Sequence, residues 1–456
     1  MIRKTFFSRF SPLFFSHFFC FFSFFVLNSL AYETSLSALY KSLDPKSIAK
    51  QLAFFELYPK TEEGQQALKT AFFLLKETDE KKLSLPKLDP SFLIRIINST
   101  PAASNLDLKE EELLFIEKIS RSLSNRKLKT FKATEEKSFW EASPEELDLA
   151  RGLLIAQIGS TPEDLKKIRL YEATLDLMAL QIKAKLPEKP RPLEKIRAIS
   201  DFIFFEMGFA FPPHSSFSEK IDSFTYLPSV IDSKKGVCLG ISILYLALAQ
   251  RLDLPLEAVT PPGHIFLRYK EPQAEELNIE TTMRGVHIPT EEYLGIELKK
   301  LPLKSLKAVI GMAFVNEASL FLKDKKFHQA AALYQKAQKY LPEDPLIQEL
   351  LGFCYLLTKK EKKGLQLLKQ VALFPDEDKL APNNLVLDVL EKRIDKKGLS
   401  EFFVPYEDNI KALSYKKQKL EKHLKKHPRF KAGLMLLASI NFEMGRHREA
   451  YLVLEQ

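Results

Sequence analysis

The chain has 456 residues, of which 45% are hydrophobic and 28% are charged. This length exceeds what one compact core needs, and the hydrophobic content excludes a disordered chain, so we expect two or three folded domains. The formal net charge of +9 is modest for the length and does not indicate a nucleic-acid partner.

The first 31 residues have the layout of a secretory signal peptide. A basic start precedes a Phe-rich apolar stretch from about Leu13 to Leu27, and a small-x-small tripeptide ends at Ala31. We therefore predict cleavage after Ala31 and export across the inner membrane, to the periplasm or beyond. An uncleaved membrane anchor is the alternative, but the apolar run is shorter than the roughly 20 residues of a full span.

The cysteines do not predict a disulfide, although export normally favours one. Only three are present, and Cys20 lies in the predicted signal peptide. Cys238 and Cys354 fall in different predicted domains, and Cys354 lies in a helix where packing is the expected role. We leave both thiols unpaired.

Residues 32–159 predict an α-helical N-terminal domain. Apolar residues recur there at spacings of three and four, and clusters of Pro, Asn and Ser separate the segments. No motif in this region indicates a function.

Cys238 is the first chemically suggestive residue in the next predicted domain, residues 160–300. A turn ending at Gly236 precedes the segment LGISILYLALAQRL, which is apolar on every face and therefore predicts a buried helix. The unpaired N–H groups at the start of a helix favour a thiolate and supply donors for an oxyanion. Because free cysteine is also a common core residue, a packing role is the alternative.

Two candidate partners for the thiol follow in chain order. A short strand and a Pro-Pro-Gly turn precede His264, which we expect to begin a second strand with His264, Phe266 and Arg268 on one face. In the third strand, LNIETT, alternation places Asn278 and Glu280 on a common face. A thiol, an imidazole base and an acid or amide that orients the base are the working set of a cysteine acyl-transfer enzyme. Asn278 is the alternative orienting group.

Two loop histidines, His214 and His287, could line the same cleft, although loop histidines usually have no special task. The chain contains no Gly-rich phosphate loop, dinucleotide-binding fingerprint or HExxH motif. We predict no cofactor and no metal in the catalytic site.

The segment GVCLGISILYLALAQRLDLPLEAVTPPGHIFLRY, residues 236–269, resembles the transglutaminase-like superfamily. More closely it resembles the SirB-type proteins, which join such a domain to tetratricopeptide repeats. The resemblance implies a papain-like α+β core in which a thiol on a central helix packs against an antiparallel sheet. It implies that Cys238 is the nucleophile, His264 the general base and Glu280 the orienting group. The superfamily usually has Asp in place of Glu280, and many SirB-type members lack the cysteine.

Residues 308–456 predict an α-helical solenoid of tetratricopeptide repeats. A period of 34 residues relates Ala318 to Gly352 and Ala330 to Gly364, and small residues at such positions let paired helices approach closely. A third copy follows an insertion near residues 379–415. We expect these repeats to bind a protein or peptide.

Residues 411–431 are strongly basic and predict a solvated helix face, with an anionic partner or membrane surface as the alternative. His423 and His427 have a spacing that could hold a metal on one face, but the flanking lysines would repel a dication.

Together these features predict a multidomain, mainly α-helical protein. The first functional hypothesis is an exported cysteine hydrolase or acyltransferase that acts on amide bonds. The second is a catalytically silent scaffold, in which the repeats bind a partner and the thiol only packs.

Overall fold

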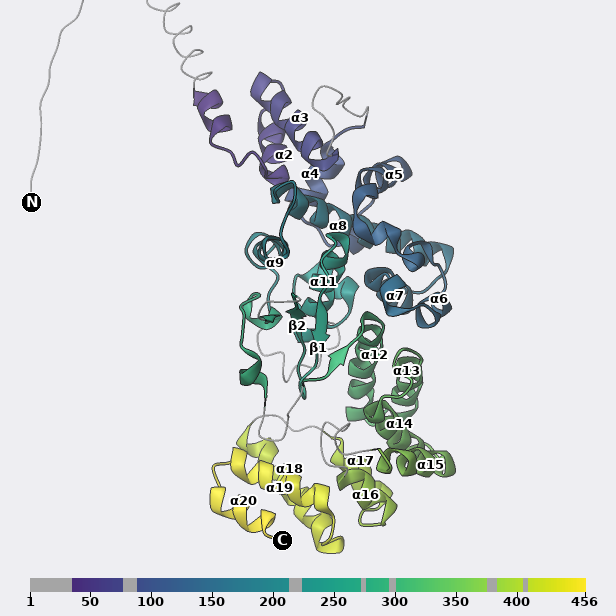
Figure 1. The fold of residues 1–456 in the computed structure, drawn as a ribbon. Helices are drawn as coiled ribbons and strands as arrows, with labels where there is room; N and C mark the ends of the chain where they lie inside the picture. Colours follow the sequence, from purple (N-terminus) through teal and green to yellow (C-terminus); the bar gives the residue numbers. More distant parts are fainter. Residues whose placement is uncertain are drawn as a thin grey trace, which may run out of the picture. The chain divides into compact units, whose positions relative to one another are not determined.

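The computed structural model contains two compact units, one ending at Ser99 and the other running from Thr100 to Gln456. The described residues are 35–76, 88–212, 224–271, 276–294, 301–374, 384–404 and 409–456. The predicted signal peptide lies outside them. The fold is mainly helical with one small antiparallel sheet, which confirms the predicted mainly α class (Figure 1).

In the first unit, three helices follow the helical residues 35–41 and share a small apolar core with them. They are α2 (Ile48–Leu57), α3 (Glu62–Lys76) and α4 (Ser91–Asn98). Ser47 caps α2 by accepting a hydrogen bond from the backbone N–H of Lys50 at 3.3 Å. The ring of Phe54 packs against those of Tyr40 and Tyr58, with centroid distances of 5.3 and 4.9 Å. These contacts give the unit a core of its own.

The second unit is organised by helix α11 (Cys238–Arg251), in which every residue from Leu239 to Ala249 is buried. This confirms the predicted buried helix. The helices that contact it are α7 (Leu149–Ile158), α8 (Pro162–Lys185), α9 (Pro192–Ser200) and α10 (Leu227–Ser233). A Cβ on Gly240 would lie 2.2 Å from the carbonyl oxygen of Phe224, so only glycine fits there. Helix α7 lies within the segment 32–159 that the sequence analysis assigned to the N-terminal domain, and it packs in this second unit.

A buried network of ion pairs joins the helices around α11. Asp176 on α8 accepts a hydrogen bond from Arg251 at 2.9 Å and another from Arg126. Arg151 on α7 pairs with Glu172 on α8 at 2.7 Å. Asp176 and Arg251 are almost fully buried, so keeping each of them charged has a large desolvation cost. The attraction between the two opposite charges offsets that cost.

A four-stranded antiparallel sheet contacts α11 through its strand β2. The strands are β1 (Glu257–Val259), β2 (Phe266–Tyr269), β3 (Leu277–Ile279) and β4 (Leu303–Lys304), in the order β3-β2-β1-β4. The expectation that His264 begins a strand is wrong, because β2 starts two residues later. The Pro-Pro-Gly turn extends to His264, whose backbone N–H donates to the carbonyl of Pro261 at 3.0 Å.

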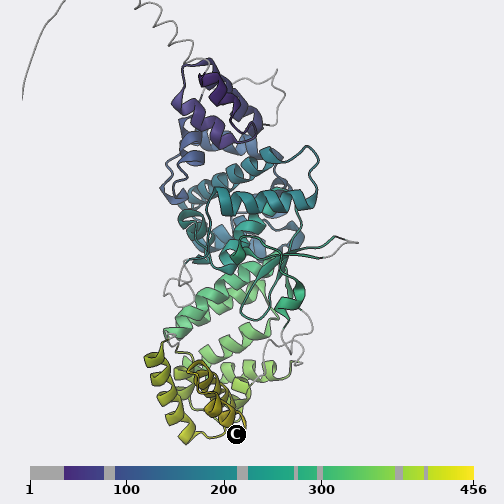
Figure 2. The ribbon, with the colours of Figure 1, turned by 90° about the vertical axis from the view of Figure 1, so that its left-hand side faces the viewer.

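The C-terminal part of the second unit consists of helices that contact their chain neighbours in pairs (Figure 2). The pairs are α12 (Leu306–Lys323) with α13 (Phe327–Tyr340), α14 (Pro345–Leu357) with α15 (Glu361–Ala372), and α19 (Lys431–Glu443) with α20 (His447–Leu454). Between the second and third pairs come α16 (Asn384–Leu390), α17 (Lys396–Phe402) and α18 (Ile410–Lys426). A Cβ on Gly364 would lie 2.7 Å from the carbonyl oxygen of Gly352, so α14 and α15 approach too closely for larger side chains at this crossing.

Within the described ranges, every helix is too short or too polar to cross a membrane.

Candidate active site

Cys238 is the first residue of α11, where its thiol is half-buried and forms no disulfide among the described residues. This confirms its predicted place in the first turn. The preceding loop is fixed by backbone hydrogen bonds: Gly236 N–H donates to the Ala210 carbonyl at 3.2 Å, and Val237 N–H to the Phe224 carbonyl at 3.1 Å. The half-buried thiol therefore follows a loop whose backbone is fixed, at the start of a helix that is buried from Leu239 to Ala249.

His264 and Glu280 are directly hydrogen-bonded. The Nε2 atom of His264 lies 2.7 Å from Oε2 of Glu280, although sixteen residues separate them in the chain. The Glu280 side chain is 3% exposed and that of His264 is 29% exposed. Because Nε2 is occupied by the carboxylate, Nδ1 is the ring nitrogen left to interact with the Cys238 side chain.

Glu280 is held from several directions, which fixes the carboxylate beside the imidazole. It directly follows β3 and caps a 3₁₀ turn, where it accepts a hydrogen bond from the backbone N–H of Thr282 at 3.0 Å. The hydroxyl of Tyr293 donates to Oε2 at 2.8 Å. The same turn is tied to the central helix, because the hydroxyls of Ser242 on α11 and Thr281 are 3.0 Å apart. The helix that carries the thiol thus also anchors the acid.

These contacts keep the imidazole charged. A hydrogen bond with the Cys238 side chain, and then one with Glu280, raise the pKa of His264 to about 10. Burial alone would raise the pKa of Glu280, but hydrogen bonds from His264, Thr282 and Tyr293 outweigh burial and lower that pKa to about 2. Between these two pKa values His264 is an imidazolium that is bonded to the Glu280 carboxylate and contacts the Cys238 side chain.

The other predicted candidates have different partners. Asn278 accepts a hydrogen bond from Arg268 Nε at 2.8 Å and donates to the Ile288 carbonyl at 2.9 Å. His287 Nδ1 lies 3.1 Å from the backbone nitrogen of Asn278. Neither side chain is bonded to His264, so Glu280 and not Asn278 contacts the imidazole. His214 lies outside the described residues.

Tyr293 is a contributor that the sequence analysis missed. Its ring stacks on Phe266 with centroids 4.1 Å apart, and lies nearly parallel to the His264 ring at 6.2 Å. It lies thirteen residues after Glu280, at the end of a short 3₁₀ helix (Thr290–Tyr293), and no periodicity of the sequence marks such a tyrosine. Only the folded chain brings its hydroxyl to the carboxylate.

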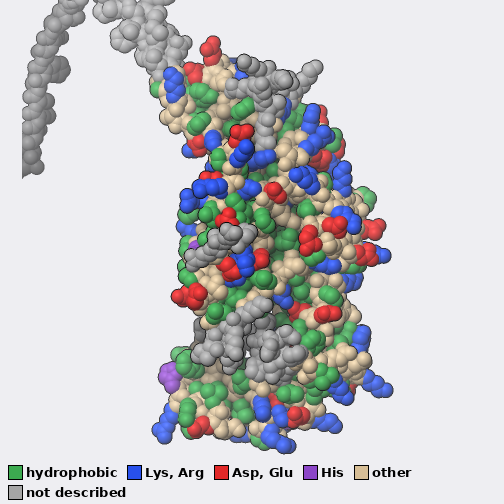
Figure 3. All heavy atoms as spheres, in the orientation of Figure 1, with side chains coloured by type: hydrophobic (Ala, Val, Ile, Leu, Met, Phe, Trp, Pro, Cys, Tyr) green, Lys and Arg blue, Asp and Glu red, His purple; other side chains and the backbone are tan. Residues whose placement is uncertain are grey.

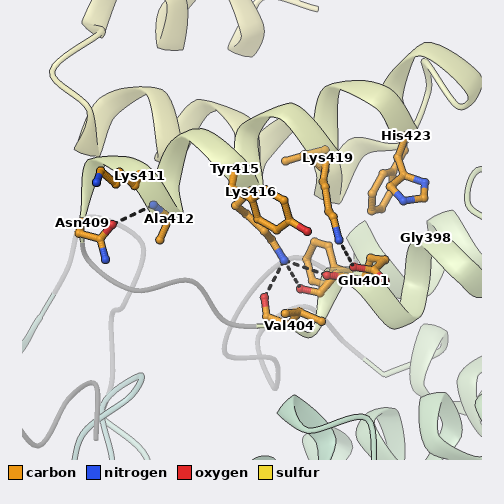
Figure 4. Close-up of a pocket in the computed structure, with 13 residues that line it drawn as sticks. Gly398, Glu401, Val404, Asn409, Lys411, Ala412, Tyr415, Lys416, Lys419 and His423 are labelled. Atoms are coloured by element: carbon orange, nitrogen blue, oxygen red, sulfur yellow. Dashed lines mark hydrogen bonds and ion pairs between the residues drawn. The ribbon is translucent and has the colours of Figure 1, made fainter.

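A separate pocket of 580 Å³ lies between α17 and α18, and Figure 4 shows its lining. Lys416 belongs to the basic stretch that we expected to be solvated, yet it is 7% exposed. Its ammonium donates to the carbonyls of Glu401, Phe402 and Val404 at 2.8, 3.2 and 2.7 Å. Burial lowers the pKa of Lys416 to about 8. This lysine therefore fixes the end of α17. The exposed basic side chains of residues 411–431 lie on the surface of the C-terminal helices (Figure 3).

The paired histidines of the basic stretch do not form a metal cluster with other side chains. His427 Nε2 is 3.7 Å from Asp395 Oδ2. Across the described part of the chain, no three or more His, Cys, Asp or Glu side chains are grouped closely enough to hold a metal ion.

Comparison with known proteins agrees with the fold of the thiol site. Residues 169–299 match the model of the transglutaminase-like superfamily. A UPF0162 protein of Xylella fastidiosa is 21% identical over 223 residues, which cover 45% of this chain and 77% of that protein. A UPF0162 protein of Pseudomonas aeruginosa is 31% identical over 150 residues, 32% of this chain and 50% of that protein. Human F-box only protein 21 is 25% identical over 166 residues, 34% of this chain and 22% of that protein.

No solved structure matches the chain. The segment 169–299 contains the thiol, the imidazole and the carboxylate described above. The chain therefore carries a transglutaminase-like superfamily domain, with UPF0162 proteins as relatives at low identity.

Proposed function

We propose that this protein is a cysteine hydrolase or acyltransferase that acts on amide bonds of a protein or peptide. Cys238 is the nucleophile, His264 the proton-transfer group and Glu280 the group that orients the imidazole. The observation that carries the proposal is the 2.7 Å hydrogen bond between Glu280 and His264, with the opposite ring nitrogen left for the thiol. A histidine that only packs in a core does not need contacts with both a buried carboxylate and a half-exposed cysteine.

The chemistry follows from this protonation state. The Cys238 thiolate attacks the carbonyl carbon of the amide, and backbone N–H groups at the start of α11 face the developing oxyanion. The His264 imidazolium then gives its proton to the departing amine nitrogen as the C–N bond breaks, which leaves a thioester on the sulfur. Water or a second amine attacks the thioester, its proton passes to the imidazole, and the thiolate is released. The identity of this acceptor separates a hydrolase from a cross-linking enzyme.

The test measures the reactivity of the thiol itself. We expect iodoacetamide to alkylate Cys238 at neutral pH at least about 100-fold faster than Cys354, because the imidazolium stabilises the Cys238 thiolate. Cys354 is a control within the same chain: it is fully buried, and burial raises its pKa to about 12. Mass spectrometry of the two cysteine peptides gives both rates from one reaction.

The matched variant is His264→Ala, which should slow alkylation of Cys238 by about ten-fold or more and leave Cys354 unchanged. Acylation of Cys238 by p-nitrophenyl acetate, with release of the acyl group to water or to an added amine, then identifies the acceptor. Slow alkylation of Cys238 that the His264→Ala change does not affect would contradict the enzyme and favour the catalytically silent scaffold.

The flanking regions complete the proposal. Residues 1–31 act as a signal peptide, so the enzyme works outside the cytoplasm, and N-terminal sequencing of the mature protein should begin at Tyr32.

The C-terminal helix pairs are tetratricopeptide repeats in a SirB-type arrangement and bind a protein or peptide partner. The spacing that relates Ala330 to Gly364, and the close approach at Gly364, support this reading. A Gly364→Leu change should abolish partner binding without slowing alkylation of Cys238.

A further inference from the structure

A second pocket in the Thr100–Gln456 unit, with a volume of 470 Å³, has a lining unlike that of the thiol site and shares no residue with it. Arg126 and Arg151 line it from 14% and 11% exposed positions, whereas Arg121 and Lys132 are exposed at its edge. The aromatic ring of Phe131 adds an apolar wall. The pocket lies along α8, beside α7 and the end of α5 (Glu110–Ile119), which Figure 1 labels.

The two interior arginines are held in place but keep unused donors. Arg151 Nη1 donates to both carboxylate oxygens of Glu172, at 2.9 and 2.7 Å, and Arg126 Nη2 donates to Asp176. The Nε atom of each arginine donates to a backbone carbonyl. A guanidinium group has five N–H donors. Among the described residues, none accepts from Nη2 of Arg151 or Nη1 of Arg126, so each keeps a pair of donors for another acceptor.

The charges around the pocket do not balance. The carboxylates that line it are Glu172 and Asp176, which pair with the interior arginines, and Glu117, which pairs with Arg169 at 2.8 Å. Among the ion pairs of the described residues, none involves Arg121 or Lys132. Two positive charges at the edge are therefore unmatched.

We propose that this pocket binds a phosphate monoester. Arg126 and Arg151 contact the phosphate oxygens from inside, and Arg121 and Lys132 neutralise its charge at the edge. A phosphate ester carries about −1.5 to −2 charges near neutral pH and presents three acceptor oxygens, which matches two unmatched cations and two partly unused guanidinium groups.

A single carboxylate fits this arrangement less well. It carries one charge, and one guanidinium fork already satisfies its two oxygens, so the remaining cations would stay unmatched. The pocket volume falls within the range of about 300–1,000 Å³ that small-ligand sites occupy. Beside the phosphate there is thus room for an organic group. The Arg126 guanidinium lies over the Phe131 ring, 4.3 Å from its centroid, so such a group would contact the part of the ring that Arg126 leaves uncovered.

The experiment is isothermal titration calorimetry of the full chain with phenyl phosphate, with benzoate as the matched monoanion. We expect phenyl phosphate to bind at least about ten-fold more tightly, because charge-assisted hydrogen bonds to arginine are strong. Arg121→Gln and Lys132→Gln should each weaken phenyl phosphate binding by about ten-fold. Both residues are exposed and form no ion pair with another described residue, so their variants should fold like the unmodified protein, as thermal unfolding can verify.

Lys118→Gln is the control, because Lys118 is an exposed cation at the end of α5 that does not line the pocket. It makes the same change in net charge and should leave the affinity unchanged. Equal weakening in all three variants would show a general charge effect and overturn the site. Absence of binding to phenyl phosphate, or benzoate binding of equal strength, would overturn the assignment of the ligand.

Discussion

Two carboxylates in the second unit, Asp176 and Glu280, are buried to a similar degree but bind different partners. Asp176 is 1% exposed and pairs with Arg126 and Arg251. Glu280 is 3% exposed and pairs with His264, a backbone N–H and a tyrosine hydroxyl. Arginine stays charged at every physiological pH, whereas histidine can give up a proton. The first cluster is therefore suited to holding helices together, and the second can pass a proton to a neighbouring thiol.

The largest effect on stability should come from breaking the arginine cluster. Asp176→Asn leaves Arg251, which is 2% exposed, without its counter-charge. We expect the free energy of unfolding to fall by about 3–5 kcal/mol, as happens when one partner of a buried ion pair is removed. Chemical denaturation followed by the fluorescence of Trp140, the only tryptophan, measures this loss.

Asp201→Asn is the matched control for this prediction, because Asp201 is exposed and forms no ion pair among the described residues. It should change the stability by less than about 0.5 kcal/mol. If both variants unfold at the same denaturant concentration, Asp176 does not hold the helices together and the contrast with Glu280 is lost.

The histidine cluster should instead be visible in the pH dependence of stability. The pKa of His264 rises from its ordinary 6.5 to about 10, so its contribution is complete below 6.5 and is lost as the pH rises through 10. The pKa of Glu280 falls from 4.5 to about 2, so its contribution is complete above 4.5 and is lost as the pH falls through 2. The pair therefore stabilises the protein most between 4.5 and 6.5.

Glu280→Gln tests this window, because an amide keeps the shape of the side chain and loses its charge. We expect it to remove roughly 2 kcal/mol of stability within the window and to flatten the dependence on either side. Thermal unfolding across the pH range measures both changes. A variant that keeps the full pH dependence of the unmodified protein would show that the carboxylate does not govern the titration of His264.

The sequence could predict the catalytic constellation only as far as local patterns reach. The all-apolar segment after Cys238 predicts a buried helix, and the Pro-Pro-Gly turn followed by alternating residues predicts a strand. Both follow from periodicity, which is local information. The choice of Glu280 over Asn278 depends on the register of β3 and on the turn after it, where Asn278 pairs with Arg268 across the strands. The pairing of strands that are distant in the chain cannot be predicted from one short segment.

Charge networks were the least predictable feature of the fold. Asp176 lies on a 24-residue helix, α8. Its two partners, Arg126 and Arg251, are 50 and 75 residues away in the chain. On sequence grounds each of these residues is an ordinary surface charge, because Asp and Arg are seldom buried. Lys416 shows the same limit, since its place in a basic run predicts solvent exposure while its ammonium is buried against three carbonyls.

The smallest expected effect sharpens the role of Tyr293, which we interpret as a positioning residue. Its hydroxyl and His264 Nε2 both bond Oε2 of Glu280, at 2.8 and 2.7 Å, so the two donors share one oxygen. Tyr293→Phe keeps the ring that stacks on Phe266 and removes only the hydrogen bond. We expect a loss of about 1–2 kcal/mol of stability and alkylation of Cys238 that is slower by less than ten-fold.

The distinguishing measurement for Tyr293→Phe is the pKa of His264, followed by NMR of its imidazole. Without the competing hydroxyl, the carboxylate oxygen interacts more strongly with the imidazolium, so the pKa of His264 should rise while the thiol becomes less well oriented. Tyr451→Phe is the control, because Tyr451 is 62% exposed on α20 and contacts none of these groups. A merely structural tyrosine would lower stability and leave the imidazole titration where it was; a rise in that pKa with slower alkylation shows that the hydroxyl sets the position of the acid.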